Sequence, residues 1–245
     1  MNSSEKKHFV LVHGAWHGAW CWEKVVPLIN VAGHAVDTID LPGLGEEQTA
    51  ILDVTLDSYV SAVADLIETI GRPVVLVGHS MGGMVITQVA EKIADKVDTL
   101  IYLTAFSPKN GETLFKYALE DTESYVSTYK QINEEEGYFV VQQDQLQECF
   151  YHMCSDEDAN NAIKRLRPQA LSPIATHLRL SDENYGRVRR CYIECSKDKA
   201  LTHDMQKRLR DNAPVDKSIV LEADHSPFYS CPEELVSAFI ALSAR

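Results

Sequence analysis

The sequence predicts an α/β fold in which a mostly parallel sheet is flanked by helices and carries a small inserted helical cap. Short apolar runs rich in β-branched residues alternate with segments of helical periodicity as far as residue 106. This alternation is typical of strands buried on both faces of a parallel sheet. The pattern changes after residue 106 and resumes near residue 188. We therefore expect a core formed by residues 1–106 and 188–245, with a cap of residues 107–187.

The core elements follow in order along the chain. Strands are expected over residues 9–12, 35–39, 73–77 and 99–103, with helices over 19–31, 57–70 and 84–93. Pro27 is a complication inside the first helix. After the cap, strands over 190–194 and 218–221 enclose a helix over 203–212, and an amphipathic helix over 233–242 ends the chain. This order favours a parallel sheet with helices on both faces.

The inserted segment differs from the core in composition. It is polar and charged between residues 117 and 136 and rich in glutamine between 142 and 147. Helical stretches are expected around 114–132 and 145–165, and only residues 138–141 have the pattern of a strand. We interpret the segment as a cap over the carboxyl edge of the sheet.

Composition limits the classes of partner. The formal net charge of −13 disfavours nucleic acids and anionic membranes and mildly favours neutral substrates. The short polar N-terminus lacks the apolar stretch of a signal peptide, and no segment is long enough to span a membrane, so a cytoplasmic protein is expected. In that compartment the six cysteines, which form no CxxC pair, are expected to be free thiols.

Residues 78–82 read GHSMG and fit the pattern G-x-S-x-G. The pattern alone is weak, but here it follows an expected buried strand directly and precedes an expected helix. A sharp strand-to-helix turn of this kind lifts a serine above the sheet, and glycines fit where a Cβ would clash. Ser80 is therefore the candidate nucleophile.

A serine hydroxyl needs a base to remove its proton. In this kind of fold the acid and then the histidine follow the serine along the chain. His225 comes just after the last expected strand of the sheet, whereas its rival His203 begins a helix. His225 is therefore the candidate base.

The acid should orient the imidazole and stabilise its charged form. Asp198 follows the strand expected over residues 190–194, at the same edge of the sheet as Ser80. The equivalent position one strand earlier, residues 103–105, has no carboxylate. Asp204 and Asp224 are weaker candidates, and a solvated turn residue is the simplest alternative interpretation of Asp198.

Two backbone N–H groups are needed to stabilise the oxyanion of the reaction. One should come from Met81, the residue after the nucleophile. The other should come from Ala15, in the loop after the first strand, where Gly14 permits close approach.

Three other patterns in the sequence are weaker evidence for a functional site. His13, His17 and Cys21 are spaced by four residues, but they span a strand end and a loop, so hydrogen-bonded histidines and a buried thiol explain them better than a metal site. The segment 43–45 lacks the lysine of a phosphate loop. The tryptophans can line a pocket or simply pack, and these are Trp16, Trp20 and Trp22. We expect neither a metal nor a cofactor.

Several segments together resemble the plant methylesterase and hydroxynitrile lyase family and its bacterial esterase relatives. They are HGAWHGAWCW at 13–22, GH at 33–34, DLPG at 40–43, GHSMGG at 78–83, RRCYIECSKDK at 189–199 and EADH at 222–225. The resemblance implies an α/β-hydrolase fold with a small helical cap, no cofactor and cleavage of small methyl or related esters. By motif match it also implies a triad and oxyanion hole at Ser80, Asp198, His225, Ala15 and Met81.

The expected function is therefore a carboxylic ester hydrolase that acts through an acyl-enzyme on small to medium uncharged esters, methyl esters among them. Two alternatives remain: a hydroxynitrile lyase, and a non-catalytic small-molecule binding protein on the same fold. The similar lyases carry a threonine where this chain has Gly14 and a lysine where it has Ser226, whereas the binding proteins usually lack a triad residue. The expected partner is a small-molecule ester, and the chain is compatible with a homodimer.

Overall fold

A six-stranded sheet forms the centre of the computed structural model, which describes residues 6–212 and 214–244. Every neighbouring pair in it runs parallel, and the strand order is β2-β1-β3-β4-β8-β9. The strands are β1 (His8–Val12), β2 (Ala35–Ile39), β3 (Val74–His79), β4 (Val97–Leu103), β8 (Arg189–Cys195) and β9 (Lys217–Leu221). The predicted parallel sheet is thus confirmed.

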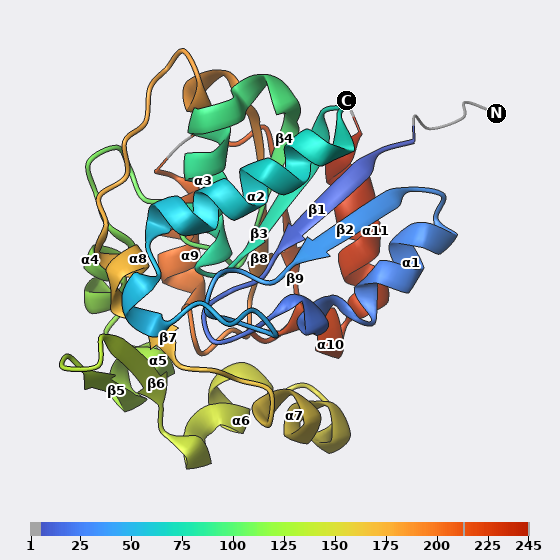
Figure 1. Ribbon diagram of the computed structural model, residues 1–245. Helices are drawn as coiled ribbons and strands as arrows, with labels where there is room; N and C mark the ends of the chain where they lie inside the picture. Colours follow the sequence, from blue (N-terminus) through green and yellow to red (C-terminus); the bar gives the residue numbers. More distant parts are fainter. Residues whose placement is uncertain (1–5, 213, 245) are drawn as a thin grey trace.

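Helices cover both faces of this sheet (Figure 1). One face carries α2 (Leu56–Ile70) and α3 (Gly82–Ile93), and the other carries α1 (Val25–Val31) and α11 (Pro232–Ser243). Two further core helices are α9 (His203–Arg210) and α10 (Pro227–Ser230). Single turns of 3-10 helix occur at Ala19–Trp22, Ile51–Asp53, Ala94–Lys96 and Tyr185–Arg187.

The helix expected over residues 19–31 is divided. A 3-10 turn at Ala19–Trp22 precedes α1, and Pro27 is the third residue of α1. The first turn of a helix leaves its N–H groups without intrahelical acceptors, so a residue without an N–H is tolerated there. The proline therefore sets where α1 begins.

The inserted segment has helices, as expected, and also a small sheet. Its helices are α4 (Leu114–Glu120), α5 (Tyr125–Tyr129), α6 (Leu146–Phe150), α7 (Asp156–Ile163) and α8 (Leu171–Ala175), with a 3-10 turn at Gln143–Gln145. Its antiparallel strands are β5 (Lys130–Asn133), β6 (Tyr138–Val141) and β7 (Gln169–Ala170). Only the strand at β6 was indicated by the sequence, because β5 is polar and β7 has two residues. The part of the segment with β5, β6, β7, α6 and α7 lies beyond the carboxyl ends of the core strands, and its last residues run back to the start of β8 (Figure 1).

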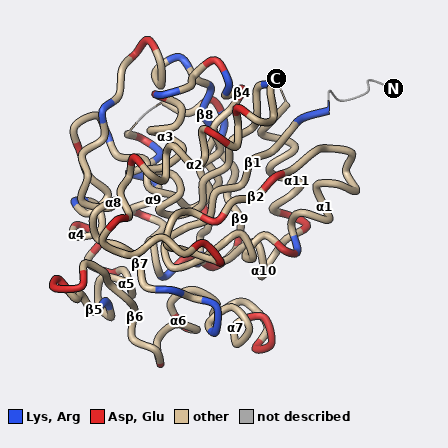
Figure 2. The backbone as a smooth tube through the Cα atoms, viewed as in Figure 1, with Lys and Arg blue, Asp and Glu red and all other residues tan. Residues whose placement is uncertain are grey.

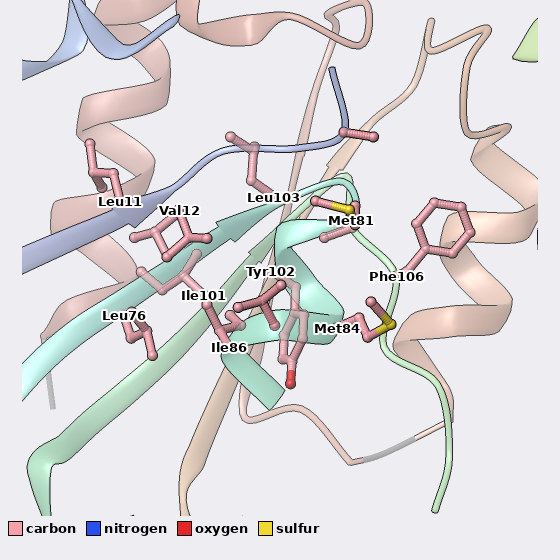
Figure 3. Packing of buried hydrophobic residues seen from close by; sticks show 14 of the residues in the cluster. Leu11, Val12, Leu76, Met81, Met84, Ile86, Ile101, Tyr102, Leu103 and Phe106 are labelled. Carbon is pink, nitrogen blue, oxygen red and sulfur yellow. The ribbon is translucent and has the colours of Figure 1, made fainter. Parts of the chain in front are cut away.

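Apolar side chains from the strands and from α3 form the core beneath the site. Figure 3 shows Met84 and Ile86 of α3 close to Ile101 and Tyr102 of β4. Tyr102 is fully buried, and its hydroxyl lies 2.7 Å from the Thr87 hydroxyl of α3. The neighbouring inner strands β1 and β3 contain no Lys, Arg, Asp or Glu, and Figure 2 shows the charged residues mainly toward the outside of the molecule. Within the described residues, no helix is long and apolar enough to cross a membrane.

Candidate active site

Ser80 occupies a strained turn between β3 and α3. Its φ of 53° lies in the left-handed region, which is costly for a residue with a side chain. The turn is held by hydrogen bonds from Ser80 N–H to the Leu103 carbonyl (3.2 Å) and from Phe106 N–H to the Ser80 carbonyl (3.0 Å). A Cβ on Gly82 would lie 2.7 Å from the His13 carbonyl oxygen, so only glycine lets α3 begin this close to β1.

His225 and Asp198 form a buried pair at the same edge of the sheet. His225 Nδ1 lies 2.6 Å from Asp198 Oδ2, and both side chains are almost wholly buried. Asp198 Oδ1 accepts the backbone N–H groups of Ala200 (2.7 Å) and Leu201 (2.9 Å). The carboxylate is therefore fixed from both of its oxygens, and its orientation fits a group that holds an imidazole.

Thr104 is a part of this arrangement that the sequence analysis missed. Its hydroxyl donates to Asp198 Oδ2 at 2.5 Å, the oxygen that also faces His225. Thr104 directly follows β4 and adopts a φ of 37°, and its N–H bonds to the Ile193 carbonyl at 2.8 Å. The sequence places Thr104 just after an expected strand, at the same edge of the sheet as Ser80. Residues 103–105 were weighed there only as a position for the carboxylate, so a residue that holds the carboxylate was overlooked.

Ala15 and Met81 lie beside Ser80 and His225 in one pocket. His13 Nε2 accepts the Leu41 N–H (3.1 Å), so the proton of this ring is on Nδ1, which donates to the Gly14 carbonyl at 2.8 Å. In a trans peptide the carbonyl and the following N–H point in opposite directions. His13 thus directs the Ala15 N–H away from itself, as an oxyanion donor requires.

Two further histidines in this layer are neutral. His17 Nδ1 donates to the Ala15 carbonyl (2.8 Å), and its Nε2 accepts the Tyr151 hydroxyl (2.7 Å). His79 donates from Nε2 to the His225 carbonyl at 2.8 Å and thereby joins the nucleophile turn to the histidine loop. Burial lowers the pKa of His13 to about 4 and of His17 to about 3, and it holds the pKa of His79 well below 6.5.

The rival residues lie elsewhere or serve other partners. His203 Nε2 lies 2.8 Å from Glu194, which also pairs with Arg210. The Asp204 side chain is 92% exposed and pairs with Lys207. Asp224 is buried, but its oxygens accept N–H and hydroxyl groups rather than an imidazole. None of these three faces the pocket that holds Ser80.

Hydrogen bonds also occupy the residues whose spacing suggested metal ligands. Both ring nitrogens of His13 and of His17 bond to protein atoms. Burial raises the pKa of the Cys21 thiol well above 9.0, which disfavours the thiolate that a metal would need. All six cysteines are free thiols, as the sequence predicted.

The cap is hydrogen-bonded to three core loops around the pocket. Trp16 Nε1 in the Ala15 loop donates to the Phe139 carbonyl of β6 at 3.1 Å. Asp121, after α4, accepts the N–H (3.0 Å) and the hydroxyl (2.6 Å) of Thr202, just beyond the Asp198 loop. Asp224, next to His225, accepts the Met153 N–H of the cap at 2.9 Å. No pattern in the sequence indicated these bonds, because each joins segments distant in the chain.

The pocket above Ser80 is lined mainly by apolar side chains from the core and the cap. Trp16 is among them, whereas Trp20 and Trp22 pack outside this lining. The other apolar lining residues are Ala15, Met81, Phe106, Leu114, Phe115, Ala118, Leu119, Val126, Ile132, Phe139, Leu171, Ile174 and Ala200. The arrangement suits nucleophilic attack on an uncharged carbonyl compound.

The fold and the site geometry agree with the comparison with known proteins. The sequence profile of the alpha/beta hydrolase family matches residues 9–238. The chain belongs to this α/β hydrolase family.

Among its relatives are several esterases. Methylesterase 1 of Arabidopsis thaliana is 34% identical over 258 residues, which cover 98% of this chain and 97% of the relative. A crystal structure of polyneuridine aldehyde esterase superposes with a TM-score of 0.88 at 29% identity, covering 98% of this chain and 100% of that one. A pyrethroid hydrolase from Sphingobium faniae gives a TM-score of 0.88 at 27% identity, covering 97% of each chain. These similarities place the protein among the serine esterases of the family.

Proposed function

We propose that the protein hydrolyses small to medium uncharged carboxylic esters, methyl esters among them, through an acyl-enzyme on Ser80. The observation that carries the proposal is the 2.6 Å contact between His225 Nδ1 and the buried Asp198 carboxylate, beside Ser80 in one pocket. Methyl esters are included among the proposed substrates because one of the relatives is named a methylesterase. We propose a small-molecule ester as the partner and the cytoplasm as the location.

The proposed reaction has two halves. His225 Nε2 takes the Ser80 proton as the hydroxyl attacks the ester carbonyl, and Asp198 stabilises the imidazolium that results. The N–H groups of Ala15 and Met81 receive the negative charge on the carbonyl oxygen. His225 then gives its proton to the departing alcohol, which leaves an acyl group on Ser80. Water, activated by His225 in the same way, releases the acid.

The positive end of α3 supports the same charge distribution. Met81 is the N-cap of this 12-residue helix, so the positive end of the helix dipole lies at the residue whose N–H is proposed to bind the oxyanion. No charged residue lies in the first turn of α3 to offset this field. The helix therefore stabilises negative charge on the side of Ser80 away from Asp198.

Two positions argue against the lyase alternative. A Cβ added at Gly14 would lie 2.8 Å from Ser80 Cβ and 2.9 Å from His79 Nδ1, so the threonine of the similar lyases does not fit without movement of the turn. Ser226 is fully buried, so a lysine there would place an ammonium group where this chain has a small neutral side chain. The chain thus lacks both the hydroxyl and the cation that would assist departure of cyanide.

The test is a direct comparison of the two reactions. Purified protein is incubated with methyl and aryl esters and, separately, with aromatic and aliphatic cyanohydrins, while acid and cyanide are measured. We expect acid release that Ser80→Ala abolishes and no cyanide above the buffer blank. Cyanide release from the wild type that is lost in Ser80→Ala would overturn the proposal in favour of a lyase.

A further inference from the structure

The polar side chains that line the pocket are already bonded to the protein. Besides Ser80 and His225, the described lining residues with a polar side-chain group are Trp16, Asp121, Ser124, Ser127 and Lys130. Trp16 donates to the Phe139 carbonyl, and both oxygens of Asp121 accept from Thr202. These side chains therefore already have hydrogen-bond partners within the protein.

The two serines and the lysine that line the pocket also donate to backbone carbonyl groups of the protein. Ser124 donates its hydroxyl to the Ala200 carbonyl at 2.7 Å, and Ser127 donates its hydroxyl to the Ala118 carbonyl at 2.7 Å. Lys130 Nζ donates to the Ser127 carbonyl at 2.7 Å. A hydroxyl on a substrate would lose its water here and would have to compete with one of these bonds. A carboxylate would also lose its water, and among these side chains only the Lys130 ammonium could pair with it.

The wall of the pocket is also held in shape. In addition to the Asp121 and Ser124 bonds, the Tyr125 N–H of α5 donates to the Lys199 carbonyl at 2.8 Å. The cap residues at the start of α5 are thus joined to the loop 199–202 through several successive residues. A wall fixed in this way selects by shape and by apolar contact rather than by rearranging its polar groups around different substrates.

We propose that the substrate is an ester whose acyl part is a sizeable apolar group, aryl or extended alkyl, without a hydroxyl or a charge. The proposal rests on the ester hydrolysis proposed above, and it assigns the acyl part to the apolar pocket because the alcohol of a methyl ester is too small to fill it. The lining of aromatic and aliphatic side chains then recognises the acyl group, and only the carbonyl meets polar donors, at Ala15 and Met81.

The size of the effect follows from transfer free energies. Each additional buried methylene should raise kcat/KM roughly fourfold until the pocket is full. Replacement of a terminal methyl by a hydroxyl of similar size should lower kcat/KM roughly tenfold or more, because the hydroxyl loses water and gains no partner. A terminal carboxylate should lower it further.

The experiment measures kcat/KM for methyl butanoate, hexanoate and octanoate, and for a matched set in which methyl heptanoate is compared with methyl 6-hydroxyhexanoate and with monomethyl heptanedioate. We expect a rise along the first series and a loss in the order methyl, hydroxyl, carboxylate in the second. Equal or greater activity on the hydroxyl or carboxylate ester would overturn the proposal. Loss of all Ser80-dependent ester hydrolysis would instead count against the proposed function itself.

Lys130→Met provides a second arm, since the ammonium of Lys130 has two further N–H groups that a carboxylate could use. We expect this variant to raise kcat/KM for methyl octanoate severalfold, because the wall becomes more apolar. The matched control Lys164→Met alters an exposed lysine that does not line the pocket and should change nothing. A selective loss of activity on monomethyl heptanedioate in Lys130→Met, from a wild type that prefers this ester, would show that Lys130 binds an anionic substrate.

Discussion

The two sides of Ser80 are built differently. On one side, a buried carboxylate faces an imidazole, and the carboxylate is held by Thr104 and by two backbone N–H groups. On the other side, the Ala15 loop has no charged group, and neutral histidines hold its carbonyl oxygens. The side that must become positive during the reaction thus has an anion, and the side that must receive negative charge has only N–H donors.

The same residue type serves both sides, and the hydrogen-bond partner decides its role. His13 and His17 bond to carbonyl oxygens, a backbone N–H and a phenol, which support a neutral ring. His225 bonds to a carboxylate, which supports a charged one. The number of histidines near a serine therefore says little about catalysis, whereas a carboxylate partner together with a place in the pocket of the serine says much.

The largest effect that should separate the two sides is that of Asp198→Asn. Loss of the charge and of the ring orientation should lower kcat roughly 10³–10⁴-fold. The matched control Asp204→Asn, at an exposed carboxylate on α9, should cost little, and steady-state kinetics on a methyl ester measures both. A larger loss in Asp204→Asn than in Asp198→Asn would mean that the acid has been assigned to the wrong residue.

A smaller effect concerns stability and the neutral side. The folded state keeps His17 neutral down to a pKa of about 3, whereas the unfolded chain protonates it near 6.5, so the unfolded state binds more protons between these values. The free energy of unfolding should therefore fall as pH decreases from about 6 to 4. His17→Gln should reduce this slope by about 1.4 kcal/mol per pH unit.

Urea unfolding at several pH values measures that slope. His177→Gln is the control, because this histidine is exposed and bonds only to a loop carbonyl, and its slope should equal that of the wild type. An unchanged slope in His17→Gln would show that His17 is protonated in the folded protein.

The core could be predicted from the sequence because its signals are local. The apolar, β-branched run at residues 74–77, directly before the GHSMG turn, indicates a buried strand, and parallel strands bring their carboxyl ends to one edge. The placement of Ser80, Asp198 and His225 at one edge followed from that rule alone.

The cap could be predicted only in outline. Its strand β5 has the polar sequence KQIN, and it forms because it pairs with β6 rather than because of its own pattern. The bonds of Thr104 and Asp121 could not be foreseen for a similar reason. Each joins residues about 80 or more positions apart, and such pairs leave no periodic signal in one sequence.

The most direct test of the account is to observe the acyl group on Ser80. Wild-type protein is mixed with p-nitrophenyl hexanoate, quenched in acid within milliseconds and analysed by intact and peptide mass spectrometry. We predict one hexanoyl group on the peptide that contains Ser80, none in Ser80→Ala, and a kcat in that variant roughly 10⁴-fold lower than that of the wild type. An acyl group on another residue, or near wild-type turnover in Ser80→Ala, would contradict the account.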